Sequence, residues 1–305
     1  MKRREFEYRL CDVFTDQPLA GNQLAVFVDA GSLTDAEMQA LACETNLSET
    51  TFICRRDAAV ERERGVRVRI FTTQEELPFA GHPTLGTATT IRSAFPEFAG
   101  AERIVLDLNA GRVPVVFDGT RGGDAARSGP RAVFGEMTQP EPKFGAEHDV
   151  AALAPVLGLE ANDFAKGWRP QTVSTGMPFA IVPLRSVEAL GRLRLDVKAS
   201  EQYLSASDAK FFYAIAHYAP GEWRARMQFY GGEDPATGSA AGCAISYLVK
   251  NEIVTAGERL HLRQGIEIGR PSDLYISANR LDSQVSEVRV GGSTVHVATG
   301  HFFLE

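Results

Sequence analysis

The chain has 305 residues, of which 44% are hydrophobic and 23% are charged. This is the composition of an ordinary globular protein, which excludes extensive disorder, and at ~150 residues per domain the length predicts two domains. The 32 basic and 39 acidic residues leave a net charge of −7, which argues against a nucleic-acid-binding protein. No run approaches the ~18 apolar residues of a membrane span, and no apolar stretch follows the charged N-terminus, so we expect a soluble, cytoplasmic protein without a membrane partner.

The cysteines and histidines do not form a metal or disulfide motif. The four cysteines contain no Cys-x-x-Cys pair and are too few for a disulfide framework, which fits a reducing compartment. The six histidines are scattered, and His296 and His301 do not have the spacing of a helical zinc motif. We therefore expect no metal.

Strands and helices alternate along the first half of the chain. Residues 8–14, 23–28, 51–54 and 66–71 read as strands. A helix is predicted over 33–44, where Thr34 and Glu37 form a capping-box pattern and Met38, Leu41 and Ala42 share one face. Pro83 suits the first turn of a second helix running to residue 94. Its small and β-branched interior suits a central helix enclosed tightly by a sheet.

The second half shows a matching order of elements. A helix is predicted over 238–250, again rich in small residues at its start. Strands are predicted at 104–108, 113–117, 259–262, 274–278, 285–290 and 294–298, with a further strand at 302–304. The glycine-rich run 118–130 reads as a hairpin tip, and 139–145 reads as the linker between domains.

Four segments recur at nearly one offset. Residues 21–27 resemble 176–182, 66–71 resemble 223–228, 80–88 resemble 236–244, and 106–111 resemble 260–265, at offsets of 155, 157, 156 and 154 residues. Matches in one order at one offset predict an internal duplication. The predicted domains are 1–131, completed by a C-terminal strand at 296–305, and 139–295.

Two of the repeated segments are helix starts with unusual chemistry, 79–83 and 233–240. Glycine lets a ligand approach the backbone, and the N–H groups of a helix start bind anions. His82 and Ser239 add side-chain donors at these places. If the halves pair, both starts face one cleft and hold a carboxylate or phosphate. The alternative is helix capping by Thr237 or Ser239, with Asp234 near the positive helix end.

Glu49 lies between a predicted helix and strand, where a partly desolvated carboxylate can act as a general base. The alternative is a surface or capping glutamate. Glu76 is equally a base or a loop charge. There is no Gly-x-Ser-x-Gly elbow, phosphate-binding loop or dinucleotide loop. A two-cysteine racemase needs a thiol at each helix start, whereas Cys43 and Cys243 lie elsewhere and are expected in the core.

Six segments together resemble the PhzF (phenazine biosynthesis-like) family over nearly the whole chain. They are 21–22, 46–50 (Asn-Leu-Ser-Glu-Thr), 70–72, 76–83 (Glu-Leu-Pro-Phe-Ala-Gly-His-Pro), 233–240 (Glu-Asp-Pro-Ala-Thr-Gly-Ser-Ala) and 264–272. The resemblance implies an α/β, diaminopimelate-epimerase-like fold. Such a fold has two pseudo-symmetric domains, each a curved, mostly antiparallel sheet wrapped around a central helix. Thr73 departs from the family's usual proline, which bears on the shape of its loop.

The same resemblance implies a cofactor-independent isomerase that moves a proton on a small unsaturated amino or hydroxy carboxylic acid. The family's well-understood member acts on trans-2,3-dihydro-3-hydroxyanthranilate, and homodimers are common in the family. Carried over by motif, the catalytic residues are Glu49, His82 and Asp234, and the substrate-binding residues are Gly81, Thr237, Gly238 and Ser239. Two other functions stay open: an amino-acid racemase or epimerase on the same fold, and a non-catalytic protein that binds a small metabolite.

Overall fold

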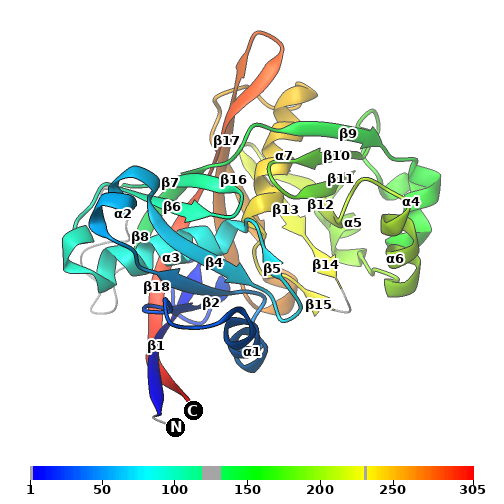
Figure 1. Cartoon of the computed structure of the whole chain (residues 1–305). Helices are drawn as coiled ribbons and strands as arrows, with labels where there is room; N and C mark the ends of the chain where they lie inside the picture. Colours follow the sequence, from blue (N-terminus) through cyan, green and yellow to red (C-terminus); the bar gives the residue numbers. More distant parts are fainter. Residues whose placement is uncertain (1–2, 119–131, 230–231) are drawn as a thin grey trace. The chain divides into compact units, whose positions relative to one another are not determined.

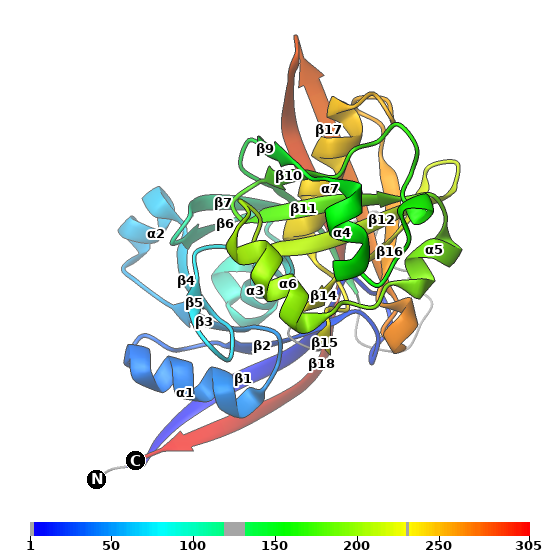
Figure 2. The same ribbon diagram turned by 90° about the vertical axis from the view of Figure 1, so that its right-hand side faces the viewer.

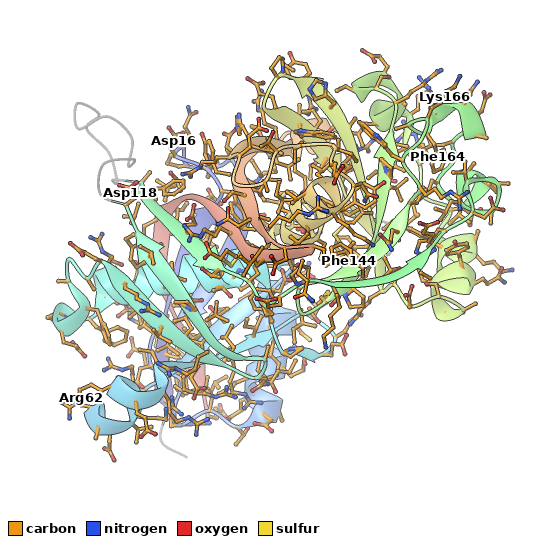
Figure 3. The ribbon with its side chains drawn as sticks, turned by 90° about the horizontal axis from the view of Figure 1, so that it is seen from above. Asp16, Arg62, Asp118, Phe144, Phe164 and Lys166 are labelled. Carbon is orange, nitrogen blue, oxygen red and sulfur yellow. The ribbon has the colours of Figure 1, made fainter. Side chains whose placement is uncertain are left out.

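The computed structural model describes residues 3–118, 132–229 and 232–305. The chain divides into two compact units: unit 1 (Met1–Thr138 with Gly291–Glu305) and unit 2 (Gln139–Val290). Apart from Asp118, labelled in Figure 3, the predicted glycine-rich hairpin tip lies outside the described residues. In the described ranges, no helix has the length and apolar character needed to cross a bilayer.

Unit 1 consists mainly of strands around one long helix. Its strands are β1 (Arg4–Val13), β2 (Asn22–Phe27), β3 (Thr50–Cys54), β4 (Val66–Phe71), β5 (Glu76–Leu77), β6 (Arg103–Leu108), β7 (Gly111–Phe117) and β8 (Val133–Thr138). Its helices are α1 (Asp35–Thr45), α2 (Ala58–Arg64), α3 (Gly81–Ala94) and the 3-10 turn η1 (Pro96–Phe98).

Unit 2 repeats this plan and adds short helices. Its strands are β9 (Lys143–Glu147), β10 (Gln171–Ser174), β11 (Pro178–Leu184), β12 (Phe211–Ala219), β13 (Glu222–Arg226), β14 (Gln228–Phe229), β15 (Gly232–Glu233), β16 (Leu260–Gln264) and β17 (Ser272–Leu281). Its helices are α4 (Val150–Val156), α5 (Val187–Arg192), α6 (Val197–Ser205), α7 (Gly238–Lys250) and the turns η2 (Ala161–Asp163) and η3 (Ile266–Ile268). The last strand, β18 (Gln284–Leu304), contributes residues to both units.

The strand order of unit 1 returns to its beginning. It runs β1-β2-β3-β4-β6-β7-β8-β18, and β18 pairs antiparallel with β1 from Arg4↔Leu304 to Val13↔Thr294. The two ends of the chain therefore lie side by side (Figure 1). In unit 2 the order is β9-β10-β11-β12-β13-β16-β17, followed by β18. The predicted fold class, mixed α/β with a strand-rich sheet around a central helix in each half, is confirmed.

The central helix of unit 1 consists largely of residues with small side chains, because its neighbours leave little space around it. A Cβ at Gly86 of α3 would lie 2.6 Å from Leu24 Cδ2 and 2.8 Å from Val13 Cγ2. Thr84 and Thr90 of this buried helix donate their hydroxyl hydrogens to backbone oxygens one turn earlier, at 2.7 and 2.9 Å, and the Thr87 hydroxyl lies 2.8 Å from that of Thr51 on β3. The predicted central helices at 83–94 and 238–250 correspond to α3 and α7 (Figure 2). Most residues of both helices are buried.

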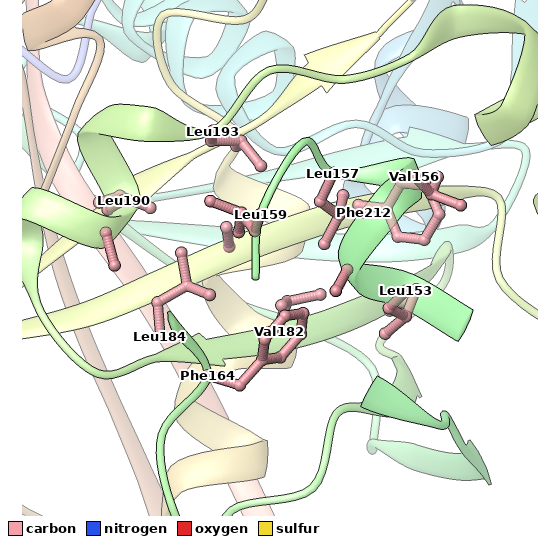
Figure 4. Packing of buried hydrophobic residues seen from close by; sticks show 14 of the residues in the cluster. Leu153, Val156, Leu157, Leu159, Phe164, Val182, Leu184, Leu190, Leu193 and Phe212 are labelled. Atoms are coloured by element: carbon pink, nitrogen blue, oxygen red, sulfur yellow. The ribbon is translucent and has the colours of Figure 1, made fainter. Parts of the chain in front are cut away.

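Each unit has a second apolar layer on the side of its sheet away from the central helix. In unit 1, α1 packs through Met38 and Leu41 on a cluster that includes Phe27, Phe52 and Phe71, and the rings of Phe27 and Phe52 stack at 4.9 Å. The predicted capping box of α1 is confirmed. In unit 2 the corresponding cluster lies between α4, α5 and the strands β11 and β12 (Figure 4).

Several local predictions were wrong. The segment 285–304 is one continuous strand, β18, rather than three, because β1 pairs along its C-terminal part. The predicted linker 139–145 contains the beginning of β9, and α2 was not predicted. The first strand ends at Val13, since Phe14 has a φ of 64°.

Candidate functional site

Glu49 lies in the loop that joins α1 to β3. The helix ends because Asn46 adopts a left-handed backbone with φ 51°, and its N–H bonds to Ala42 O. Across the loop, Thr45 Oγ1 and Thr50 Oγ1 lie 2.7 Å apart. Both ends of this short loop are therefore fixed, and the Glu49 side chain keeps 17% of its surface exposed.

His82 faces this carboxylate from the first turn of α3. Its Nε2 lies 3.6 Å from Glu49 Oε2, is buried, and has no hydrogen-bond partner among the described residues. The other ring nitrogen, Nδ1, lies 3.1 Å from Asn22 Nδ2 at the start of β2, which fixes the orientation of the ring. Burial lowers the pKa of His82 to about 3, against the opposing effect of a hydrogen bond to the backbone of Gln23. The ring is therefore neutral at physiological pH, and the contact with Glu49 is not an ion pair.

Asp234, Thr237 and Ser239 lie together at the start of α7 in unit 2. Asp234 is 8% exposed, Thr237 7% and Ser239 5%. Thr237 Oγ1 donates to Asp234 Oδ2 at 2.6 Å. The structure thus brings Glu49 and His82 together in unit 1, and these three residues together in unit 2.

The N-cap residue does not cap either central helix with its side chain. Ala80 and Thr237 occupy the N-cap positions of α3 and α7, and neither makes a side-chain cap hydrogen bond. The capping role considered for Thr237 is wrong, because its hydroxyl is used on Asp234. The first-turn N–H groups, beginning at Gly81 and Gly238, keep the capacity to bind an anion.

The two helix starts are equivalent residue by residue. Both helices begin at a glycine, and Gly81 and Gly238 are 157 residues apart, so the predicted pairing of this segment at 156 was wrong by one residue. At 157, segment 76–82 aligns with 233–239, with glutamate, proline and glycine identical. His82 and Ser239 then occupy the same place on their helices.

An arginine–glutamate pair holds the segment before each helix. Arg69 binds Glu76 through two hydrogen bonds of 2.8 and 2.6 Å, and Arg226 binds Glu233 through two of 2.9 and 2.6 Å. The guanidinium of Arg69 lowers the pKa of Glu76. This geometry favours Glu76 as an ionised structural partner over a general base.

The thiols do not lie at the helix starts. Cys243 is buried one turn inside α7, and burial raises its pKa to about 12. Cys43 on α1 is exposed, so its predicted place in the core was wrong, because at about 100° per residue it points away from the face formed by Met38, Leu41 and Ala42. The positions of both thiols, and the raised pKa of Cys243, do not suit a two-cysteine racemase.

Unit 2 also contains a cavity of about 540 Å³ at the far end of α7. Val249, Glu252, Trp223 and Arg280 are among the residues that line it, and none of the predicted site residues is. Within 3–118, 132–229 and 232–305, no group of three or more His, Cys, Asp or Glu side chains is placed to hold a metal ion.

Two polar residues that contact the predicted site residues, Asn22 and Gln264, were given no role from the sequence. Their position within the segments that carry the family resemblance was the only indication that they are functional. The contacts of Asn22 with His82, and of Gln264 with Thr237, join residues 60 and 27 positions apart in the chain. No local pattern predicts such pairs.

Comparison with known proteins identifies the family of the chain. The family model described as "Phenazine biosynthesis-like protein" matches residues 11–300. The chain is 35% identical to trans-2,3-dihydro-3-hydroxyanthranilate isomerase of Pseudomonas aeruginosa, over 97% of this chain and 99% of that protein. A solved structure of a predicted epimerase from Pseudomonas aeruginosa superposes with a TM-score of 0.81 at 35% identity, covering 98% of this chain and 100% of that one.

A more distant likeness concerns the fold alone. A hydroxyproline epimerase from Agrobacterium vitis superposes with a TM-score of 0.67 at 12% identity, covering 100% of this chain and 93% of that one. The protein is therefore an isomerase built on an epimerase-like fold. It belongs to the PhzC–PhzF family of phenazine biosynthesis-like proteins.

Proposed function

We propose that the protein is a cofactor-independent isomerase that moves a proton along a small unsaturated amino or hydroxy carboxylic acid. The first substrate to test is trans-2,3-dihydro-3-hydroxyanthranilate, the compound named for the Pseudomonas relatives. The observation that carries the proposal is the partly exposed Glu49 carboxylate, 3.6 Å from the buried, neutral imidazole of His82.

Glu49 acts as base and then as acid in this proposal. Its carboxylate takes a proton from a carbon activated by the adjacent unsaturated system, so a C–H bond breaks and the double bonds shift. The protonated Glu49 then returns the proton to a carbon further along the system. No electron is gained or lost, and one carboxylate on one face of the substrate suffices. A racemisation would need a second group on the opposite face.

The remaining residues hold the substrate. The N–H groups at Gly81 and at Gly238–Ser239, with the hydroxyl of Ser239, suit a carboxylate, because a helix N-terminus attracts anions. Asp234 accepts hydrogen bonds from the amine or hydroxyl groups. His82, being neutral, assists the proton movement without placing a positive charge next to Glu49.

We also propose that the protein works in the cytoplasm as a homodimer, which rests on the family resemblance. Light scattering after gel filtration tests the oligomeric state. A mass of one chain, 33.2 kDa, at micromolar concentration would contradict the dimer.

The test of the reaction is deuterium uptake. The protein is incubated in D2O with dihydro-hydroxyanthranilate and a panel of amino and hydroxy acids, and NMR follows where deuterium enters. Glu49→Gln is compared with Glu44→Gln, an exposed glutamate of α1 that serves as the matched control. Because general acid–base catalysis contributes about 10²- to 10⁴-fold, Glu49→Gln should lose activity by that factor and Glu44→Gln should keep it.

The possible outcomes distinguish between the candidate functions. Uptake with a shifted double bond, lost in Glu49→Gln, supports the isomerase. Uptake at Cα with loss of chirality indicates a racemase. Uptake that survives in Glu49→Gln refutes the assignment of the base. Binding without exchange indicates a metabolite-binding protein.

A further inference from the structure

One buried amide joins β16 to the start of α7. Gln264 is fully buried, and its Oε1 accepts hydrogen bonds from Thr237 N at 3.1 Å and from Tyr213 Oη at 2.8 Å. Its Nε2 donates to Asp234 O at 2.8 Å and to Thr237 Oγ1 at 2.9 Å. An amide has two acceptor and two donor positions, so the capacity of Gln264 is filled. A backbone N–H only donates and a backbone C=O only accepts, so the amide has one possible orientation.

This orientation sets the direction of the next hydrogen bond. The Thr237 hydroxyl oxygen accepts a hydrogen bond from the Gln264 amide, so the hydroxyl hydrogen must be donated to a different acceptor. Asp234 Oδ2 lies 2.6 Å away, and Met227 Sδ, a weaker acceptor, lies 3.2 Å away. A directed chain therefore runs from the Gln264 amide through Thr237 to the carboxylate of Asp234.

The backbone next to Gln264 is built for this close approach. Gly265 has a φ of 76°, which favours glycine. A Cβ at this position would lie 2.6 Å from Pro235 O and would also clash with Arg270 O. A side chain here would push the end of β16 away from the Asp234–Pro235 segment.

Unit 1 shows that the helix start does not need this network. At an offset of 157, Asp234 corresponds to Leu77 and Thr237 to Ala80. The pairing of β4 with β6 and of β13 with β16 makes Leu108, the last residue of β6, the counterpart of Gln264. These three residues of unit 1 are apolar, and yet α3 forms, with no side-chain cap hydrogen bond from Ala80. All three positions are polar in unit 2, which argues for a chemical purpose over a structural one.

We propose that Gln264 is a positioning residue for the isomerase: acting through Thr237, it holds the Asp234 carboxylate as an oriented acceptor for the amine or hydroxyl of the substrate. This inference rests on the role proposed above for Asp234. A carboxylate has about four lone-pair positions, so the bond from Thr237 orients the group without saturating it.

The test uses matched pairs in the full-length protein. Thr237→Val removes the hydroxyl at constant shape, Thr237→Ser keeps it, and Gln264→Met removes the amide at similar length. Thr237→Val removes the hydrogen bond to the charged Asp234 carboxylate, and Gln264→Met removes the amide that directs this bond. In both variants kcat/KM should fall about 10- to 100-fold, chiefly through KM. Thr237→Ser keeps the hydroxyl, so it should recover most of the kcat/KM that Thr237→Val loses. The double variant Gln264→Met/Thr237→Val should be no worse than the poorer single variant, because both act in series.

A second readout needs no substrate. In protein labelled with 13C at aspartate carboxyls, the Asp234 resonance, assigned with Asp234→Asn, should shift in Gln264→Met and Thr237→Val and stay in place in Thr237→Ser. If Gln264→Met does not fold, the two Thr237 variants decide. Equal KM values and an unmoved resonance overturn the inference while the isomerase stands. A shifted resonance in a protein inactive on every acid supports the positioning role and refutes the proposed function.

Discussion

His82 predicts a specific dependence of stability on pH. Its pKa falls from the ordinary 6.5 to about 3 in the folded protein, because burial disfavours the charged ring. Between pH 3 and pH 6.5, His82 is protonated in the unfolded chain and neutral in the folded protein. The free energy of unfolding is therefore highest above pH 6.5 and falls as the pH drops toward 3.

The size of the effect follows from the shift. At ~1.36 kcal/mol per pKa unit, His82 makes the protein less stable at pH 5 than at pH 7.5 by about 2 kcal/mol, and at pH 3 by about 4 kcal/mol. Burial also lowers the pKa of His148 and His296, so those residues add to the same trend. The contribution of His82 has to be isolated by comparison with His82→Gln.

The assay is urea unfolding of both proteins at pH 7.5 and pH 5. The wild type should lose about 2 kcal/mol more than His82→Gln between the two pH values, since the other groups cancel in the difference. NMR of the histidine ring carbons measures the same quantity directly. An equal loss in the two proteins, or a His82 midpoint above pH 6, would refute the reasoning from burial.

Three further predictions concern packing and thiols. Arg226→Met removes the charged partner of the buried Glu233 carboxylate, which keeps a hydrogen bond from Gln228 Nε2, and should lower the free energy of unfolding by about 3–5 kcal/mol in chemical denaturation; an unchanged midpoint would contradict a tight pair. Gly86→Ala overpacks the centre of unit 1 and should lower the free energy of unfolding by about 1–3 kcal/mol, measured by thermal unfolding. An unchanged stability would mean that α3 can shift to make room for the methyl group. An alkylating reagent should modify the exposed Cys43, spare the buried Cys243 and leave isomerisation intact; inactivation by the reagent would favour racemase chemistry.

The sequence by itself determined the central helices and the order of the functional motifs. Local rules are sufficient for these features and for α1: the starts of the central helices carry glycine and proline, and the capping box of α1 needs only Thr34 and Glu37, three residues apart. The small residues of α3 and α7 also predicted enclosure, since only a tightly packed helix has use for so many of them.

Only the tertiary structure decided how the site residues behave. Whether His82 is charged depends on burial, and whether Thr237 caps its helix depends on Asp234 and on Gln264, which lies on another strand. The pairing of Arg69 with Glu76 likewise favours a structural role for that glutamate. Side-chain burial and the choice among possible hydrogen-bond partners depend on how the whole unit packs, and neither spacing nor composition contains that information.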